Sequence, residues 1–227
     1  MVLAHSLIGQ NTLMRLDHVS YVASHDQISD VVNRIGSQIG TAFIDGGIHP
    51  KFGTRNFTAP LLNGQYIEIV CPLDHPATDA TPFGQAVKKK AEAGGGWLTW
   101  VFSSSDLAGI EEKFGRKAAD GSRTRPDGSE LKWKQIGVKE IVGSGELPFF
   151  IQWLTDNHPS KDGNSVAKIS KLVIADDEKL ADSWFQDEIK SALTDVEIEW
   201  VKPDLNDGDK GIVAVELTVN NSKVKLD

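Results

Sequence analysis

The sequence lacks most of the features that mark secreted, membrane or nucleic-acid-binding proteins. Among 227 residues it has one cysteine, Cys71, which excludes a disulfide framework and fits a reducing cytoplasm. No apolar run approaches the roughly 18 residues of a membrane helix, so we expect no membrane partner. Basic residues number 24 against 32 acidic ones, too few for a surface that follows phosphates, so we expect no nucleic-acid partner.

The amino-terminal stretch also lacks the basic segment that opens a secretory signal peptide. Residues 1–14 are therefore predicted to be an extension ahead of the folded part. Hydrophobic residues make up 40 % of the chain and charged residues 25 %, which is ordinary for a globular protein. These observations favour a globular protein of the cytoplasm.

One stretch of the sequence occurs twice in similar form. YIEIVCPLDHP runs from 66 to 76, and FFIQWLTDNHP runs from 149 to 159. Each copy is a strand pattern led by an aromatic residue and followed by a short loop that closes with His-Pro, at His75 and at His158. Because a residue before proline is restricted to extended conformations, we interpret both His-Pro pairs as structural strand ends. The repeat indicates a duplicated unit.

The first copy closes a series of five predicted elements. A strand at 15–23 precedes an amphipathic helix at 26–40, whose apolar residues recur at helical spacing. Three short strands follow, separated by glycine and proline, at 41–48, 53–61 and 65–71. The order of elements is therefore βαβββ.

The second copy closes a matching series. A connecting helix at 81–93 leads to a strand at 96–106 and a helix at 107–117. A hairpin with a Pro-Asp-Gly turn at 122–138 and a closing strand at 147–154 complete the order βαβββ.

We therefore predict an α+β fold built from paired βαβββ modules, one at 15–80 and one at 81–160. A shorter strand–helix–strand–strand pattern at 166–227 predicts a partial third βαββ unit. No low-complexity linker separates the three parts, so we expect them to pack as one body or as a two-module core with an appended half.

The two modules contain segments that resemble a known family. These segments are LDHVSYVA, GGIHPKFGTRN, GQYIEIV, SRTRPDGSELKW, and PFFIQW with its following His-Pro, all between residues 16 and 159. They are similar to glyoxalase-like domain proteins of the vicinal oxygen chelate superfamily, which includes glyoxalase I, bleomycin resistance proteins and extradiol dioxygenases. The resemblance implies two facing half-barrels, with a divalent metal between them held by the first and last strand of each module.

The resemblance also implies which residues would hold the metal. Alternation along the strands puts His18 and Glu68 on inward faces, and both match ligand positions of the family. In the second module, Gln152 is expected in place of the second carboxylate and Trp97–Thr99 in place of the second histidine. Three ligands plus water would make an open catalytic site for Zn, Fe, Mn or Ni. Loss of the second pair would instead leave a metal-free cleft, and both readings stay open.

Two further polar residues are candidates for the cleft of the first module. His49 follows two glycines, which let the backbone approach a ligand, and it is a candidate general base together with Glu68. Asn56 offers a donor and an acceptor to a substrate. The structural alternative is that His49 is a loop histidine before proline and that Asn56 stabilises the turn.

Aromatic and cationic residues complete the candidate set. Tyr66, Trp97 and Trp153 are expected to line the cleft and bind the substrate. On the hairpin, Arg125 or its neighbour Arg123 would clamp a substrate carboxylate. The alternative is that these arginines pack across the strands against Trp133.

Three functions follow from these candidates. A metal-assisted lyase, isomerase or dioxygenase would bind adjacent oxygens of a small substrate at His18 and Glu68, while Glu68 or His49 moves the proton. A non-catalytic protein would hold a small organic ligand in the same cleft without a metal. The third function is structural or dimerising, and a homodimer is compatible with all three.

Overall fold

The computed structural model describes residues 14–142, 147–176, 193 and 195–227. The first module consists of β1 (Met14–Val22), α1 (Ile28–Ile39), β2 (Ile44–His49), β3 (Thr54–Pro60) and β4 (Tyr66–Pro72). The helix α1 forms because Ile28, Ile35 and Ile39 recur at helical spacing and are buried on one side. It ends at Gly40, whose left-handed backbone favours glycine.

Two helices connect the modules, α2 (Pro76–Ala80) and α3 (Pro82–Glu92). Thr81 begins α3 because its side chain accepts the backbone N–H of Gly84, and Pro82 occupies the first turn. The second module consists of β5 (Gly96–Ser104), α4 (Ala108–Phe114), β6 (Ala119–Thr124), β7 (Glu130–Ile136) and β8 (Phe149–Trp153).

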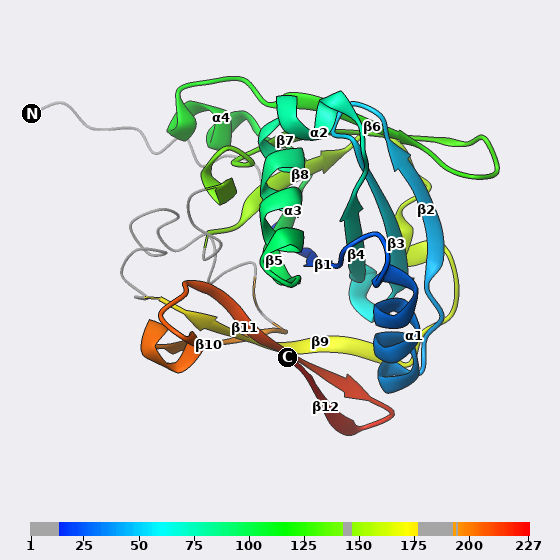
Figure 1. The fold of residues 1–227 in the computed structure, drawn as a ribbon, viewed down its shortest axis with the longest axis vertical. Coiled ribbons are helices and arrows are strands. Elements are labelled where there is room, and N and C mark those ends of the chain that lie inside the picture. The colour runs from blue at the N-terminus through cyan, green and yellow to red at the C-terminus, as the bar shows by residue number, and fades with distance from the viewer. Residues whose placement is uncertain (1–13, 143–146, 177–192, 194) are drawn as a thin grey trace, which may run out of the picture.

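The eight strands of the two modules close into a barrel in the order β1-β4-β3-β2-β6-β7-β8-β5 (Figure 1). Each module contributes four neighbouring strands, so the predicted α+β fold with two facing half-barrels is confirmed. The half-barrels meet at two seams. Along one seam β1 and β5 pair over eight residue pairs, and along the other β2 and β6 pair at Ile48 and Thr124 in the described part of the chain.

The carboxy-terminal part forms a separate four-stranded sheet. Its strands are β9 (Ala167–Ala175), β10 (Glu197–Val201), β11 (Gly211–Val219) and β12 (Ser222–Leu226), in the order β10-β9-β11-β12. The helix predicted after β9 falls at 177–192 and lies outside the described residues. A turn with positive φ at Asn220 and Asn221 joins β11 to β12, and asparagine is among the residues that tolerate this backbone best.

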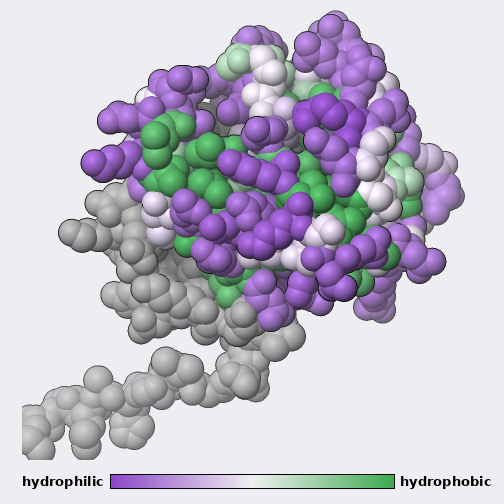
Figure 2. Space-filling model, turned by 90° about the horizontal axis from the view of Figure 1, so that it is seen from below, coloured by the Kyte–Doolittle hydropathy of each residue, from purple (hydrophilic) through white to green (hydrophobic). Residues whose placement is uncertain are grey.

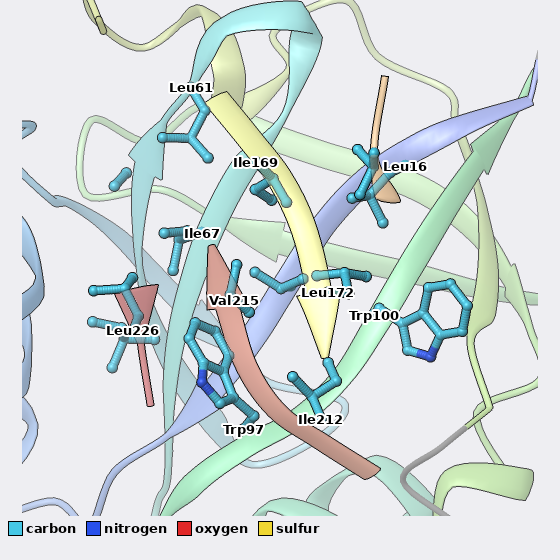
Figure 3. Close-up of a cluster of buried hydrophobic side chains, with 14 of the residues drawn as sticks. Leu16, Leu61, Ile67, Trp97, Trp100, Ile169, Leu172, Ile212, Val215 and Leu226 are labelled. Atoms are coloured by element: carbon cyan, nitrogen blue, oxygen red, sulfur yellow. The ribbon is translucent and has the colours of Figure 1, made fainter. Parts of the chain in front are cut away.

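This second sheet packs on the outside of the barrel. Figure 3 shows side chains of the barrel wall, among them Leu16, Ile67 and Trp100, gathered against Leu172 and Val215 of the sheet. All five are almost or completely buried. Each such side chain contributes about 1.5–3 kcal/mol relative to exposure. The outer face of β1, β4 and β5 is therefore covered, which leaves the barrel interior for a site.

A second buried cluster fills part of that interior. This cluster contains Phe83, Ala86 and Val87 of α3 together with the inward-facing Val101 and Ile151. The helix α3 is therefore packed against inward-facing side chains of β5 and β8.

The visible surface is mixed in character. Figure 2 views the molecule from the side of the four-stranded sheet, and hydrophilic residues cover most of this face with apolar residues showing between them. Within the described ranges, no helix has the length and apolar character needed to cross a membrane.

Candidate functional site

A pocket inside the barrel brings polar side chains from both modules together. The space between protein atoms there is about 440 Å³, a volume that includes the opening of the pocket to solvent. Its polar lining consists of His18, His49, Asn56, Glu68, Arg123 and Gln135. The first four come from strands of the first module and the last two from β6 and β7.

Glu68 is the acidic group of the pocket, and both of its oxygens are occupied. Oε1 accepts a hydrogen bond from Asn56 Nδ2 at 2.6 Å, and Oε2 accepts one from Ser20 Oγ at 2.6 Å. Burial alone would raise the pKa of Glu68, but the neighbouring His18 and His49 and these hydrogen bonds outweigh burial and lower the pKa. Glu68 is therefore an anion at neutral pH.

Arg123 is the cationic group, and Asn56 links it to Glu68. The guanidinium donates from Nη1 to Asn56 Oδ1 at 2.5 Å, and its residue is only 3 % exposed. Burial lowers the pKa of Arg123, the direction expected for a cation removed from water. Gly46 makes room for this pair, because a Cβ at Gly46 would lie 1.8 Å from Arg123 Nη1 and 2.2 Å from Asn56 Oδ1.

A buried carboxylate orients His18. Asp17 Oδ1 accepts a hydrogen bond from His18 Nδ1 at 2.8 Å, and Asp17 is 0 % exposed. The His18 ring stacks on Tyr66 with 4.3 Å between ring centroids. Because Nδ1 carries the proton that Asp17 accepts, Nε2 is the basic nitrogen, and it has no hydrogen-bond partner among the described residues.

Asp17 is held in place by a second histidine. Its Oδ2 contacts His158 Nε2 at 3.1 Å, Trp153 Nε1 at 3.3 Å and Arg15 Nη2 at 3.2 Å. The backbone N–H of Ser160 donates to His158 Nδ1, so Nε2 carries the proton and donates to Asp17. Burial would raise the pKa of Asp17, but the hydrogen bonds from the two histidines outweigh it and hold the pKa far below its ordinary range.

His49 is a neutral imidazole at neutral pH. Burial is the main cause, and it lowers the pKa of His49 to about 4. Its Nδ1 lies 3.0 Å from Thr54 Oγ1, and the edge of its ring meets Trp133 with 5.9 Å between centroids. His49 is therefore a weak base that can offer a ring N–H to a ligand.

The structure brings most of the predicted site residues into this one pocket and leaves three outside it. The residues in the pocket are His18, His49, Asn56, Tyr66, Glu68 and Trp153. Trp97 packs on the outside of the barrel, against Tyr21 with 5.1 Å between ring centroids. Arg125 forms an ion pair with Asp162 at 2.8 Å. Gln152 donates from Nε2 to the backbone oxygen of Ser105 at 2.7 Å.

The ladders of the two half-barrels show which residues are equivalent. The β1–β4 ladder pairs His18 with Tyr66, and the β5–β8 ladder pairs Val101 with Phe149. Tyr66 and Phe149 are equivalent because each is the aromatic residue that begins the closing strand of its module. Val101, and not a residue of the 97–99 segment, is therefore the equivalent of His18.

The same registers correct the predicted equivalent of Glu68. Glu68 pairs with Ser20 of β1, and Ile151 pairs with Ser103 of β5. Ile151 therefore occupies the place that was predicted for Gln152. The prediction was wrong by one residue, and a one-residue shift along a strand turns the side chain to the other face of the sheet.

These residues do not fit the divalent-metal site implied by the resemblance. The second module offers the apolar Val101 and Ile151 at the positions where it would supply two ligands. Both oxygens of Glu68 are engaged in hydrogen bonds, and the nearby cation is Arg123. Within the described residues, no group of three or more His, Cys, Asp or Glu side chains is arranged to hold a metal ion.

The sequence did not point to Asp17 as a site residue. It favoured Arg125 over Arg123, and it gave His158 a structural role alone. The β1–β5 register shifts between Leu16 and His18, so Asp17 departs from simple alternation and contacts its own neighbour. No sequence signal shows such a shift. Arg123 lies within β6, whereas Arg125 follows the end of that strand at Thr124, so the alternation that would put both arginines on one face does not extend to Arg125.

The comparisons with known proteins agree with this architecture. A hypothetical protein from Staphylococcus aureus superposes with a TM-score of 0.64 at 16 % identity, over 92 % of both chains. Methylmalonyl-CoA epimerase from Mycobacterium tuberculosis gives a TM-score of 0.42 at 16 % identity, over 65 % of this chain and 93 % of that chain. No curated protein matches the sequence.

The match to a sequence family is more extensive. The family described as glyoxalase-like domain matches residues 16–188, which is more than half of the chain and includes both half-barrels. The chain therefore belongs to the glyoxalase-like domain family.

Proposed function

We propose that this protein is an enzyme that removes and returns a proton on a small organic molecule bound inside the barrel, as a lyase or isomerase does. The observation that carries the proposal is the Asp17–His18 pair, which faces a pocket that also contains Arg123. Removing a proton from carbon requires a base close to that carbon and a positive group close to the oxygen that becomes negative.

His18 is the base in this proposal. Asp17 holds the Nδ1 proton and so keeps the lone pair of Nε2 available to the pocket. The substrate proton moves to Nε2, and the electron pair of the broken C–H bond moves onto the adjacent carbonyl oxygen as an enolate. Asp17 remains ionised and stabilises the imidazolium that forms. Return of the proton to a different atom or face of the substrate yields the isomer.

Arg123 and His49 are the groups available to the enolate oxygen. Arg123 donates charged hydrogen bonds in a buried setting, where they are stronger than in water. His49 is neutral, and when the Thr54 hydroxyl donates to its Nδ1, its Nε2–H is directed away from Thr54 as a further donor.

Deuterium exchange tests this proposal. We expect wild-type protein to speed the exchange of the carbon-bound protons of pyruvate and 2-oxobutyrate in D₂O, followed by proton NMR. His18→Gln should abolish the exchange because it removes the base, and Asp17→Asn should slow it because it no longer holds the correct tautomer. His25→Gln, a change at an exposed histidine, should retain it. Exchange no faster than in buffer, or unchanged in His18→Gln, would refute the proposal.

A non-catalytic binding protein is the second candidate, and the aromatic lining favours it. Trp133, Trp153 and Phe52 line the same pocket and offer apolar surface to a ligand without taking part in proton transfer. Ligands that quench tryptophan fluorescence or raise the melting temperature, yet undergo no exchange with wild-type protein, would decide for this candidate.

A further inference from the structure

We infer that the pocket selects organic acid anions and that Arg123 holds the substrate carboxylate. This inference rests on the proposed function for the reaction that follows, and it adds the substrate class. The binding itself is argued from the environment of Arg123.

The guanidinium of Arg123 has more donors than the protein satisfies. It carries several N–H groups in a planar fork, and among the described residues its one hydrogen bond goes from Nη1 to Asn56 Oδ1. Arg123 is 3 % exposed and lines the pocket. No nitrogen of Arg123 is among the fully buried atoms without a partner, so its remaining N–H groups reach the open space of the pocket, where water or a bound ligand accepts them.

The obvious internal partner, Glu68, is kept from occupying this fork. Its Oε1 accepts from Asn56 and its Oε2 accepts from Ser20, so Asn56 stands between the anion and the cation. The fork therefore stays available to a second carboxylate, whose two oxygens match its geometry.

The surroundings of the pair hold the guanidinium in this position. Gly46 leaves room for Arg123 Nη1 and Asn56 Oδ1, which a Cβ there would displace. Arg125, two residues further on, is engaged by Asp162 and by the backbone oxygen of Asn157 outside the pocket. The carboxylate-binding role expected from the hairpin therefore falls to Arg123.

Calorimetric titration with matched acids and amides tests the inference. The probes are pyruvate and malonate, with pyruvamide and malonamide as neutral counterparts of the same shape. We expect the acids to bind wild-type protein more tightly than the amides. Arg123→Gln should weaken the acids by roughly 30-fold or more, because it removes a desolvated charge partner. Arg125→Gln is the matched control and should leave the acid affinity nearly unchanged.

A second variant keeps the charge and moves it. Gly46→Ala retains Arg123, but the new methyl group displaces Arg123 Nη1 and Asn56 Oδ1 from their positions. The affinity for acids should therefore fall, while the circular dichroism spectrum stays that of a folded protein. Gly109→Ala in α4 is the control, because no atom lies within 4 Å of a Cβ there, and it should bind as the wild type does.

The outcomes separate this inference from the proposed function. His18→Gln should lose deuterium exchange yet keep acid binding, since His18 is the base and Arg123 holds the carboxylate. Acid binding that depends on Arg123 in a protein without exchange would support the inference and refute the proposed function. Equal binding of acids and amides, acid affinity unchanged in both Arg123→Gln and Gly46→Ala, or no acid binding at all would overturn the inference.

Discussion

His49 shows at the scale of one residue how burial makes stability depend on pH. Burial lowers its pKa from 6.5 to about 4, so between these values the unfolded chain binds a proton that the folded chain does not. The free energy of unfolding should therefore fall as the pH drops from 6.5 to 4, with His49 contributing roughly 3 kcal/mol of the loss.

Urea unfolding of wild type and His49→Gln at several pH values measures this contribution. The variant should lose less stability than the wild type across the window, because glutamine does not titrate. His25→Gln changes an exposed histidine and should keep the wild-type slope. Parallel pH curves for wild type and His49→Gln would contradict the burial argument.

Glu68 carries a prediction about hydrogen bonding. In Glu68→Gln, one of the two carboxylate oxygens becomes an NH₂ group. Facing Asn56, this group meets another donor; facing Ser20, it makes the hydroxyl an acceptor, so the hydroxyl hydrogen loses the acceptor that Glu68 provided. We expect the free energy of unfolding to fall by about 1–3 kcal/mol, the cost of an unmatched buried polar group. Thermal or chemical unfolding checks this, and Glu112→Gln at an exposed position should change little. A variant as stable as the wild type would contradict it.

Individual site residues could be predicted from sequence only where strand alternation is regular. His18 and Glu68 were assigned to inward faces by alternation, and both line the pocket. Gln152 was assigned by matching the two copies of the repeated stretch, with a register wrong by one residue. Asp17 lies at the register shift of β1, where alternation carries no information.

At the scale of elements, the four-stranded sheet supports the barrel through one face of β11. Leu217 is completely buried in the shared core, whereas the adjacent Glu216 lies on the other face and is partly exposed. Leu217→Ala should lower the free energy of unfolding by about 2–5 kcal/mol through lost burial and the cavity left behind. Glu216→Ala should stay within about 0.5 kcal/mol of the wild type. Equal effects of the two changes in chemical unfolding would mean that the sheet does not support the barrel.

The two His-Pro pairs show how one local motif was used differently in the two modules. His75 accepts the backbone N–H of Ala77 and begins α2, and His158 accepts that of Ser160 in the same way. Both histidines have the extended backbone expected before proline, but they lie beyond the strand ends at Pro72 and Trp153 and cap a helical turn. His158 additionally donates to the buried Asp17 from its other nitrogen, a contact between distant segments that local sequence cannot indicate.

At the scale of the whole molecule, the duplication was predictable and the packing of its parts was not. Alternating and helical spacing repeat along the chain, so two βαβββ modules could be derived from the sequence. The seams between β1 and β5 and between β2 and β6, and the contact of the second sheet with the barrel, join segments that share no local pattern.

The unequal contributions of the two modules lead to a prediction about metals. Because Val101 and Ile151 stand where a second pair of ligands would be needed, we expect no stoichiometric Zn, Fe, Mn or Ni in protein purified without chelator. Elemental analysis measures the metal content, and a chelator should leave the melting temperature and the deuterium exchange unchanged. Stoichiometric uptake that disappears in His18→Gln would show that the first module holds a metal by itself.

The two seams between the half-barrels differ in strength, so the barrel should open at one seam before the other. The seam between β1 and β5 has eight residue pairs, whereas the seam between β2 and β6 has the pair Ile48 and Thr124. Separating β2 from β6 breaks far fewer hydrogen bonds than separating β1 from β5. The backbone amides of β2 and β6 should therefore exchange with solvent before those of β1 and β5. A ligand that contacts Asn56 in the first half-barrel and Arg123 in the second would hold the two half-barrels together. The rate at which β2 and β6 separate would then set the residence time of that ligand.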